Sequence, residues 1–221
     1  MGILYSGGKD STFSLYKVFD KHEIECLITV EPATNESMLF HYPNIWVTKH
    51  QAKILGLPQI YEVQKSNETD TLVKAIKRAV KEYGVEGIVT GGIKSKFQKD
   101  KFQKTFDLTG VIGISPLWGI DEISYLWSLL HSGFRFILTK VSALGLGKDW
   151  LGKVFDNRMI ECLIERSIKY GFNPSLEGGE GETLVLDMPY FKRELIVSDY
   201  TIFWYNDWGY LKVNSLSEKV K

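Results

Sequence analysis

Short apolar runs alternate with helical patterns along the first half of this 221-residue chain. The apolar runs have the length and composition of buried strands and lie at 2–5, 26–30, 59–63, 85–90 and 111–114. Helical patterns separate them, beginning after Thr12 and again over 48–55, 69–83 and 95–106. Because strands joined by helices pair in parallel and are covered on both faces, the alternation predicts a doubly wound, mainly parallel α/β sheet.

The pattern changes in the second half of the chain. Helices are predicted over 121–132 and 158–170, a strand over 136–141, and two strands within 195–213 around a turn at Asn206-Asp207. A loop rich in glycine and glutamate fills 177–183. We therefore expect an α/β domain over residues 1–118 and a smaller C-terminal α+β part over 119–221.

Charge and cysteine content exclude several classes of protein. The 27 Lys and Arg balance 27 Asp and Glu, which argues against a chain whose main task is to coat nucleic acid or an anionic membrane. The two cysteines are too far apart in sequence for a zinc knuckle or a disulfide scaffold, and no apolar run is long enough to span a bilayer. We expect a reduced, cytoplasmic protein without stable nucleic-acid binding.

The clearest chemical signal is the run Ser6-Gly7-Gly8-Lys9-Asp10-Ser11-Thr12, between the first predicted strand and helix. Glycines let a backbone approach an anion, and the amides at a helix N-terminus favour phosphate. The run lacks the spacing of a Walker A loop and of a dinucleotide fingerprint. The alternative is an ordinary turn whose helix is capped by Ser or Asp.

This run resembles the S-G-G-x-D-S loop of the ATP pyrophosphatases, which cleave ATP to AMP and pyrophosphate to adenylate a substrate. Three further segments, 38–44, 115–118 and 177–183 continuing to 186–189, resemble the diphthine–ammonia ligase branch. The resemblance implies a Rossmann-like fold of the PP-loop type. It also implies ATP-dependent amidation of diphthine, a modified histidine of translation elongation factor 2, through an adenylated carboxylate.

The loop chemistry and the resemblance together predict the site residues. Catalytic roles are predicted for Lys9, Asp10, Glu180 and Glu182. The residues expected to bind ATP and pyrophosphate are Ser6, Gly7, Gly8, Lys9, Asp10, Ser11, Thr12, Gly91 and Gly92. Those expected at the substrate are His41, Gln98, Trp118, Glu177, Gly178, Gly179 and Thr183. Mg²⁺ is expected with ATP, and Asp10 is its candidate ligand.

Three glutamates in one loop would repel a triphosphate, so we expect a cation between Glu177, Glu180 and Glu182. Mg²⁺, ammonium and the quaternary ammonium of diphthine all qualify, and Trp118 would offer the last a cation–π face. A solvated acidic turn is the alternative. His41 fits substrate contact and a structural hydrogen bond equally well. The lysines between 94 and 104 either are solvated or reach the phosphates or the protein substrate.

The chain departs from the family pattern at two positions. Gly181 stands where relatives often have an aromatic residue, and Lys101 where an arginine is expected, which removes bidentate geometry. The C-terminal extension of eukaryotic relatives is not expected, so the chain resembles the compact archaeal type. No glutaminase is recognisable, which makes free ammonium the expected nitrogen source, and a homodimer is left open. The rival functions are a tRNA-modifying adenylating enzyme and a non-catalytic ATP-binding module.

Overall fold

The computed structural model describes residues 1–33, 44–65 and 67–221 of the chain. The described chain divides into two compact units, Met1–Trp118 and Gly119–Lys221. No helix within the described ranges combines the length and the apolarity needed to cross a membrane.

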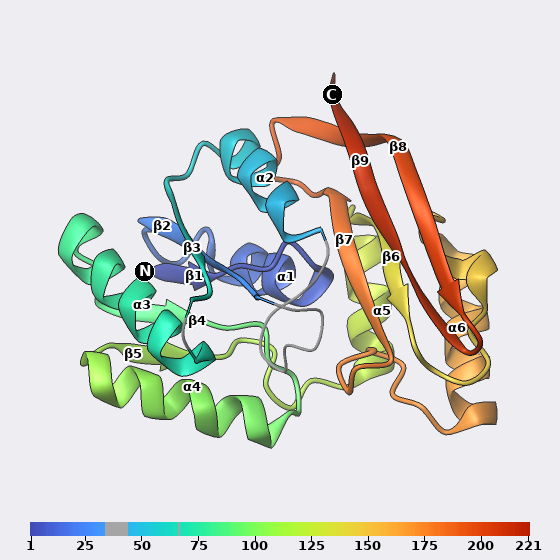
Figure 1. Cartoon of the computed structure of the whole chain (residues 1–221), viewed down its shortest axis with the longest axis horizontal. Helices are drawn as coiled ribbons and strands as arrows, with labels where there is room; N and C mark the ends of the chain where they lie inside the picture. The colour runs from blue at the N-terminus through green and yellow to red at the C-terminus, as the bar shows by residue number, and fades with distance from the viewer. Residues whose placement is uncertain (34–43, 66) are drawn as a thin grey trace. The chain divides into compact units, whose positions relative to one another are not determined.

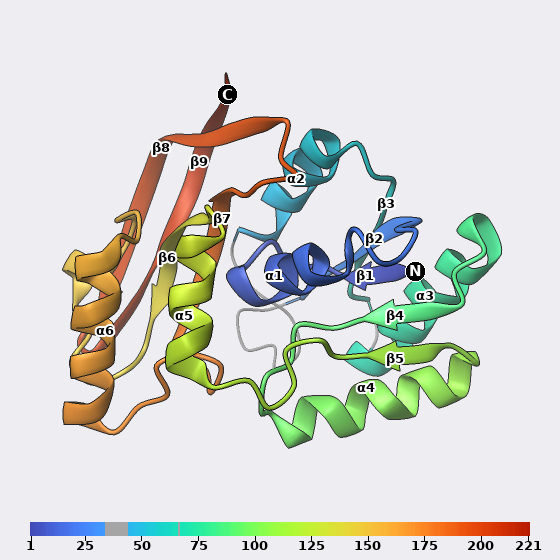
Figure 2. The same cartoon turned by 180° about the vertical axis from the view of Figure 1, so that it is seen from behind.

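The first unit is built on a parallel sheet with strand order β3-β2-β1-β4-β5. Its strands are β1 (Gly2–Leu4), β2 (Cys26–Glu31), β3 (Gln59–Val63), β4 (Gly87–Val89) and β5 (Ile112–Ile114). Its helices are α1 (Lys9–Val18), the short η1 (Ile45–Val47), α2 (Thr48–Leu55), α3 (Glu68–Tyr83) and α4 (Lys96–Thr109). Helix α3 lies on one face of the sheet and α1 on the other (Figures 1 and 2). The predicted doubly wound α/β fold is confirmed.

The strand order reverses at β1, which pairs with β2 on one side and β4 on the other. Ile3 of β1 is in register with Leu27 of β2 and with Val89 of β4. In open parallel sheets, ligands bind beyond the carboxyl ends of the strands at such a reversal. The loops that follow β1 and β4 therefore occupy the expected binding position.

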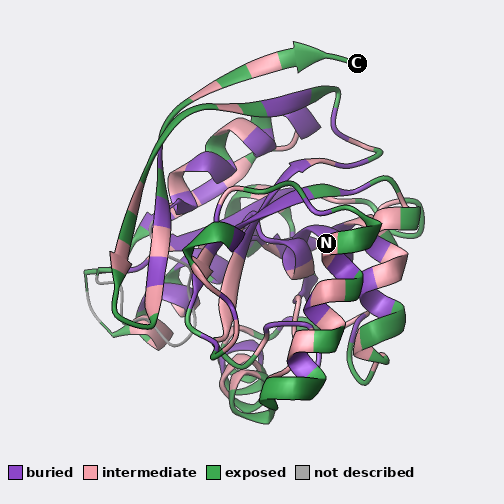
Figure 3. Ribbon diagram, turned by 90° about the vertical axis from the view of Figure 1, so that its right-hand side faces the viewer, coloured by how far each residue is buried: buried purple, intermediate pink, exposed green. Residues whose placement is uncertain are grey.

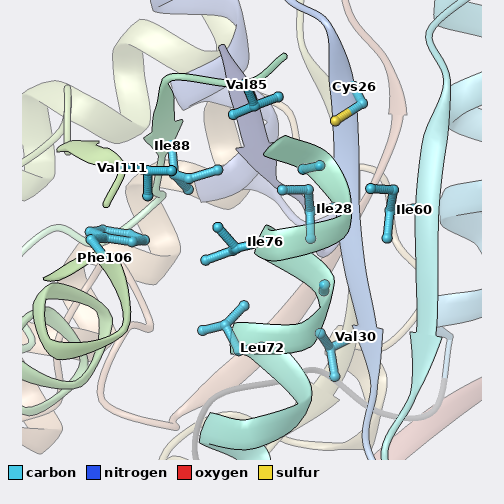
Figure 4. Packing of buried hydrophobic residues seen from close by; sticks show 12 residues of the cluster. Cys26, Ile28, Val30, Ile60, Leu72, Ile76, Val85, Ile88, Phe106 and Val111 are labelled. Atoms are coloured by element: carbon cyan, nitrogen blue, oxygen red, sulfur yellow. The ribbon is translucent and has the colours of Figure 1, made fainter. Parts of the chain in front are cut away.

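Apolar stripes on α3 and α4 form the core of this unit. Leu72 and Ile76 of α3 pack with Ile28 of β2 and Ile88 of β4, and Phe106 of α4 joins the same cluster (Figure 4). Each such side chain contributes roughly 1.5–3 kcal/mol when it is fully buried. The helices accordingly show buried residues on one side and exposed residues on the other (Figure 3).

Local signals set the ends of α3. The side chain of Asn67 caps its N-terminus by accepting a hydrogen bond from the amide of Asp70 at 2.8 Å. Gly84 ends the helix in the left-handed conformation with φ of 65°. The apolar face of the helix and Gly84 predict it within one residue, whereas the cap at Asn67 is seen only in the structure.

The second unit carries an antiparallel sheet with strand order β7-β6-β9-β8. The strands are β6 (Arg135–Val141), β7 (Gly181–Asp187), β8 (Arg193–Tyr205) and β9 (Trp208–Val220). The helices are α5 (Glu122–His131), the short η2 (Lys148–Trp150) and α6 (Asn157–Tyr170). The predicted smaller α+β part is confirmed, and β8 and β9 form a hairpin around Asn206 and Asp207.

The sequence interpretation of 177–183 as a loop is wrong for its last part. Gly181, Glu182 and Thr183 begin strand β7, which pairs with β6 in antiparallel register. The cause is tertiary: the run from Thr183 to Leu186 is buried and β7 pairs with β6, which outweighs the local preference of glycine and glutamate for loops.

Candidate active site

The glycine loop that follows β1 leads directly into α1. Gly8 is the N-cap of this helix, and its backbone is extended, with φ of −80° and ψ of 171°. No side chain caps the helix. This geometry differs from an ordinary turn capped by Ser or Asp, and it leaves the end of the helix to backbone groups, the arrangement that suits an anion.

Two hydroxyl groups tie the loop to the first turn of α1. Ser11 Oγ accepts a hydrogen bond from the amide of Ser6 at 3.2 Å and lies 3.1 Å from Ser6 Oγ. It also donates to the carbonyl of Gly8 at 3.2 Å. The structure thus brings together Ser6, Gly8 and Ser11, three of the residues predicted to bind pyrophosphate.

Lys9 is buried although it is a lysine, with 2% of its surface exposed. Its Nζ lies 2.9 Å from each carboxylate oxygen of Asp10. A buried cation needs such a partner because its desolvation is costly. The two predicted catalytic residues of the loop are therefore in direct contact.

Thr12, the last residue of the predicted loop, faces the core. Its hydroxyl donates to the hydroxyl of Tyr5 at 3.3 Å. Burial raises the pKa of Tyr5, and the hydrogen bond from Thr12 opposes that rise without cancelling it. The Tyr5 phenol therefore stays neutral. Thr12 and Tyr5 are both buried, so their hydrogen bond supports the loop from its core side.

Gly91 meets the glycine loop at the start of α1. A Cβ built on Gly91 would lie 2.8 Å from the amide nitrogen of Ser11 and 2.9 Å from the carbonyl carbon of Asp10. The predicted role for Gly91 was nucleotide binding, and the geometry adds a packing requirement. Gly92 follows it, half-buried, and Thr90 Oγ1 lies 2.8 Å from Ser115 Oγ at the ends of β4 and β5.

Helix α4 and the residues just before it carry the basic segment whose lysines were expected either to be solvated or to reach the phosphates or the protein substrate. Lys94, Lys96 and Lys99 are exposed, and Lys99 Nζ lies 4.1 Å from the ring centroid of Trp118. Trp118, predicted as a cation–π face for the substrate, thus already binds a cation of its own chain. Gln98 lies in the first turn of α4, where its backbone N–H donates to Ser95 Oγ at 3.4 Å.

Lys101, at the position of the expected arginine, is half-buried, with Nζ 4.8 Å from the ring centroid of Phe97. Its ammonium therefore lies on an aromatic ring of the same helix.

The glutamate loop of the second unit is held by backbone contacts. Leu176 and Gly179 have positive φ values of 60° and 92°, and the hydroxyl of Ser142 donates to the carbonyl of Gly179 at 2.5 Å. A Cβ on Gly178 would lie 2.7 Å from Glu180 Oε1. Gly179 therefore needs to be glycine for its conformation, whereas a Cβ on Gly178 would require only a shift of the flexible Glu180 carboxylate.

The glutamates of this segment differ in their surroundings. Glu180 Oε1 accepts from the amide of Asn173 at 3.2 Å, while Glu180 Oε2 is buried and, within the described chain, has no hydrogen-bond partner. Glu182 Oε1 lies 3.5 Å from Lys140 Nζ. Glu177 is half-buried, and Thr183 is buried in β7. A buried carboxylate oxygen without a partner is costly, so Glu180 Oε2 has the capacity to bind a cation.

Two results limit the predicted site. His41 lies outside the described residues, so its role stays a prediction. Across the described ranges, no group of three or more His, Cys, Asp or Glu side chains is arranged to hold a metal ion. Mg²⁺ commonly binds one or two carboxylates and the phosphates of the nucleotide, but both carboxylate oxygens of Asp10 face Lys9 Nζ, so the role of Asp10 as a magnesium ligand stays a prediction.

The sequence interpretation missed residues that hold the glycine loop from behind. Gln51 of α2 donates from Nε2 to the carbonyl of Gly7 at 3.2 Å, and Thr29 of β2 donates to the carbonyl of Tyr5 at 2.7 Å. Neither residue belongs to a recognisable motif. Gln51 lies 44 residues after Gly7 in the sequence, so only the contact in the folded structure reveals its role.

A parallel sheet that leads from β1 through an uncapped glycine loop into α1 defines a Rossmann-like α/β protein. Comparison with known families then narrows the class. Residues 1–112 match the model of the diphthamide synthase N-terminal domain, and residues 121–219 match that of the diphthamide synthase C-terminal domain. The chain belongs to the diphthamide synthase family.

Curated relatives carry the name diphthine–ammonia ligase. The Homo sapiens protein is 32% identical over 220 residues, covering 89% of this chain and 82% of the human protein. The Schizosaccharomyces pombe protein is 31% identical over 234 residues, covering 96% of this chain. The chain spans only 38% of the length of that yeast protein.

Proposed function

We propose that the chain is a diphthine–ammonia ligase, which uses ATP to convert diphthine on translation elongation factor 2 into diphthamide. The observation that carries the proposal is the uncapped glycine loop with buried Lys9, in a chain whose two halves both match diphthamide synthase domains. The loop supplies the phosphate chemistry and the family supplies the substrate.

In the first half-reaction, the diphthine carboxylate attacks the α-phosphorus of ATP. The bond from that phosphorus to the bridging oxygen breaks, and pyrophosphate leaves while an acyl adenylate forms. Negative charge grows on the leaving group, and Lys9 and the amides at the start of α1 stabilise it. Mg²⁺, held by Asp10 and the phosphates, would neutralise further charge when bound.

In the second half-reaction, ammonia attacks the carbonyl carbon of the acyl adenylate and AMP leaves. Ammonium must lose a proton before it can attack. We assign the binding and deprotonation of ammonium to Glu180, because its buried Oε2 has no partner within the described chain. Glu182 is the second choice, since its carboxylate already faces Lys140.

The cysteines do not favour the rival of a sulfur-inserting tRNA enzyme. The pKa of the Cys26 thiol is raised to about 12, chiefly because the side chain is buried. The thiol is therefore protonated at neutral pH and is a poor nucleophile. Cys162 lies on α6 in the other unit of the chain.

The test is to incubate the chain with diphthine-bearing elongation factor 2, ATP and ¹⁵N-ammonium, and to measure label in the factor by mass spectrometry. We expect one nitrogen per diphthine and equal amounts of AMP and pyrophosphate. Release of AMP without label, or tight and salt-sensitive binding of tRNA, would overturn the assignment. The partners proposed are elongation factor 2 and free ammonium, in the cytoplasm. Gel filtration would test a homodimer.

A further inference from the structure

We infer that Gln51 of α2 is a positioning residue for the pyrophosphate loop, an inference that rests on the proposed function. Its side-chain Nε2 donates to the carbonyl oxygen of Gly7 at 3.2 Å. Gln51 is completely buried. A buried side-chain amide without a hydrogen bond lowers the stability of the fold relative to an apolar side chain of the same shape. A fully buried glutamine on a core-facing helix therefore points to a specific hydrogen bond.

Gln51 and Gly7 are fitted to each other. Gly7 has a φ of 78°, in the left-handed region that favours glycine. A Cβ on Gly7 would lie 2.5 Å from Gln51 Oε1 and 3.1 Å from Thr48 Cγ2, both on α2. The backbone of the loop therefore rests directly on α2, and Gln51 fixes its direction there.

The consequence follows from the planarity of the peptide group. In a trans peptide, the carbonyl and the next N–H point in opposite directions. Because Gln51 holds the carbonyl of Gly7 toward α2, the amide N–H of Gly8 points away from α2. Its hydrogen bond to Ser6 Oγ is long, at 3.4 Å, so this N–H retains the capacity to bind a stronger acceptor.

Gly8 is the N-cap of α1, so this N–H lies at the positive end of the helix. The peptide before Ser6 is held in the same way, since Thr29 donates to the carbonyl of Tyr5 at 2.7 Å. Two side chains from behind the loop thus orient two of its peptides, Tyr5–Ser6 and Gly7–Gly8. We assign the Gly8 N–H as a hydrogen-bond donor to the leaving pyrophosphate. Gln51 does not touch the pyrophosphate and acts only by orienting this peptide.

The test uses Gln51→Met, which keeps the shape of the side chain and removes its donor. Charge on the leaving group grows in the transition state, so we expect kcat to fall about 10- to 100-fold and the KM for ATP to change less. The dissociation constant of inorganic pyrophosphate, measured by isothermal titration calorimetry, should rise about tenfold. If Gln51→Met does not fold, Gln51→Leu gives the same comparison.

Gln64→Met is the matched control. Gln64 Oε1 accepts a hydrogen bond from the backbone amide of Ala33 at 3.1 Å, away from Gly7 and the residues that hold it. This variant should lower the melting temperature while pyrophosphate still binds as in the wild type. Equal losses in both glutamine variants, wild-type binding in folded Gln51→Met, or no pyrophosphate binding by the wild type would each overturn the inference.

Binding and turnover separate the two proposals. If the wild type binds pyrophosphate and Gln51→Met weakens that binding, the inference about Gln51 holds even where no diphthine is amidated, and only the proposed substrate falls.

Discussion

Gly91→Ala isolates the close approach between the loop after β4 and the start of α1. The new Cβ would lie 2.8 Å from the backbone nitrogen of Ser11. One of the two backbones must move by about 0.6 Å to reach ordinary van der Waals contact. Because φ of Gly91 is outside the positive range, no backbone strain is added to the clash. Overpacking of this kind costs about 1–3 kcal/mol.

Displacement of the start of α1 should also slow the reaction. A 1 Å misplacement costs about 100-fold in rate, so we expect a fall in kcat of about tenfold for Gly91→Ala, measured as pyrophosphate release. The melting temperature should fall by roughly 2–12 °C.

Gly147→Ala is the matched control for this variant. Gly147 also has a negative φ, of −103°, and its new Cβ would meet only the mobile carboxylate of Asp149. Wild-type kcat in Gly91→Ala, or an equal loss in Gly147→Ala, would refute the argument that Gly91 sets the position of the loop.

Three further changes test other parts of the structure. Lys9→Ala should abolish pyrophosphate release while circular dichroism shows the fold intact, and normal turnover would remove the loop from the reaction. Glu180→Gln should raise the KM for ammonium more than Glu182→Gln does, and unchanged ammonium dependence in both would exclude this loop from nitrogen transfer. For Glu62, burial opposes ionisation, but hydrogen bonds from Lys74 and Arg78 outweigh it and hold the pKa below its usual range. Arg78→Ala should therefore cost about 1–2 kcal/mol at pH 7, and its deficit in urea unfolding should shrink as the pH falls below the ordinary glutamate pKa of about 4.3, because the ion pair is lost once Glu62 is protonated.

Local signals explain why much of the fold was predictable from sequence. Helix α2 was predicted with both ends correct, and Gly56 ends it in the left-handed conformation with φ of 73°. Strand β3 was likewise predicted with both ends correct. Caps, glycines and apolar periodicity are encoded within a few residues of the element that they define, so they can be read without the tertiary structure.

Contacts between distant segments explain what was missed. Strand β7 begins with Gly181 and Glu182, which locally favour a loop, and it becomes a strand because β6 lies beside it. Gln51 is one polar residue of an amphipathic helix, and nothing in the sequence distinguishes a buried glutamine from an exposed one. The placement of Lys99 on Trp118 depends in the same way on tertiary packing.

The absence of a capping side chain on α1 has a thermodynamic consequence. Gly8 in place of Ser or Asp leaves α1 less stable by a few tenths of a kcal/mol, and it brings no side-chain acceptor of its own to the first amides of the helix. A ligand that binds there stabilises the folded state in proportion to its concentration relative to its dissociation constant. The N-terminus of α1 is thus slightly less stable alone than a capped helix would be. We expect the free energy of unfolding of the chain to rise with the concentration of nucleotide.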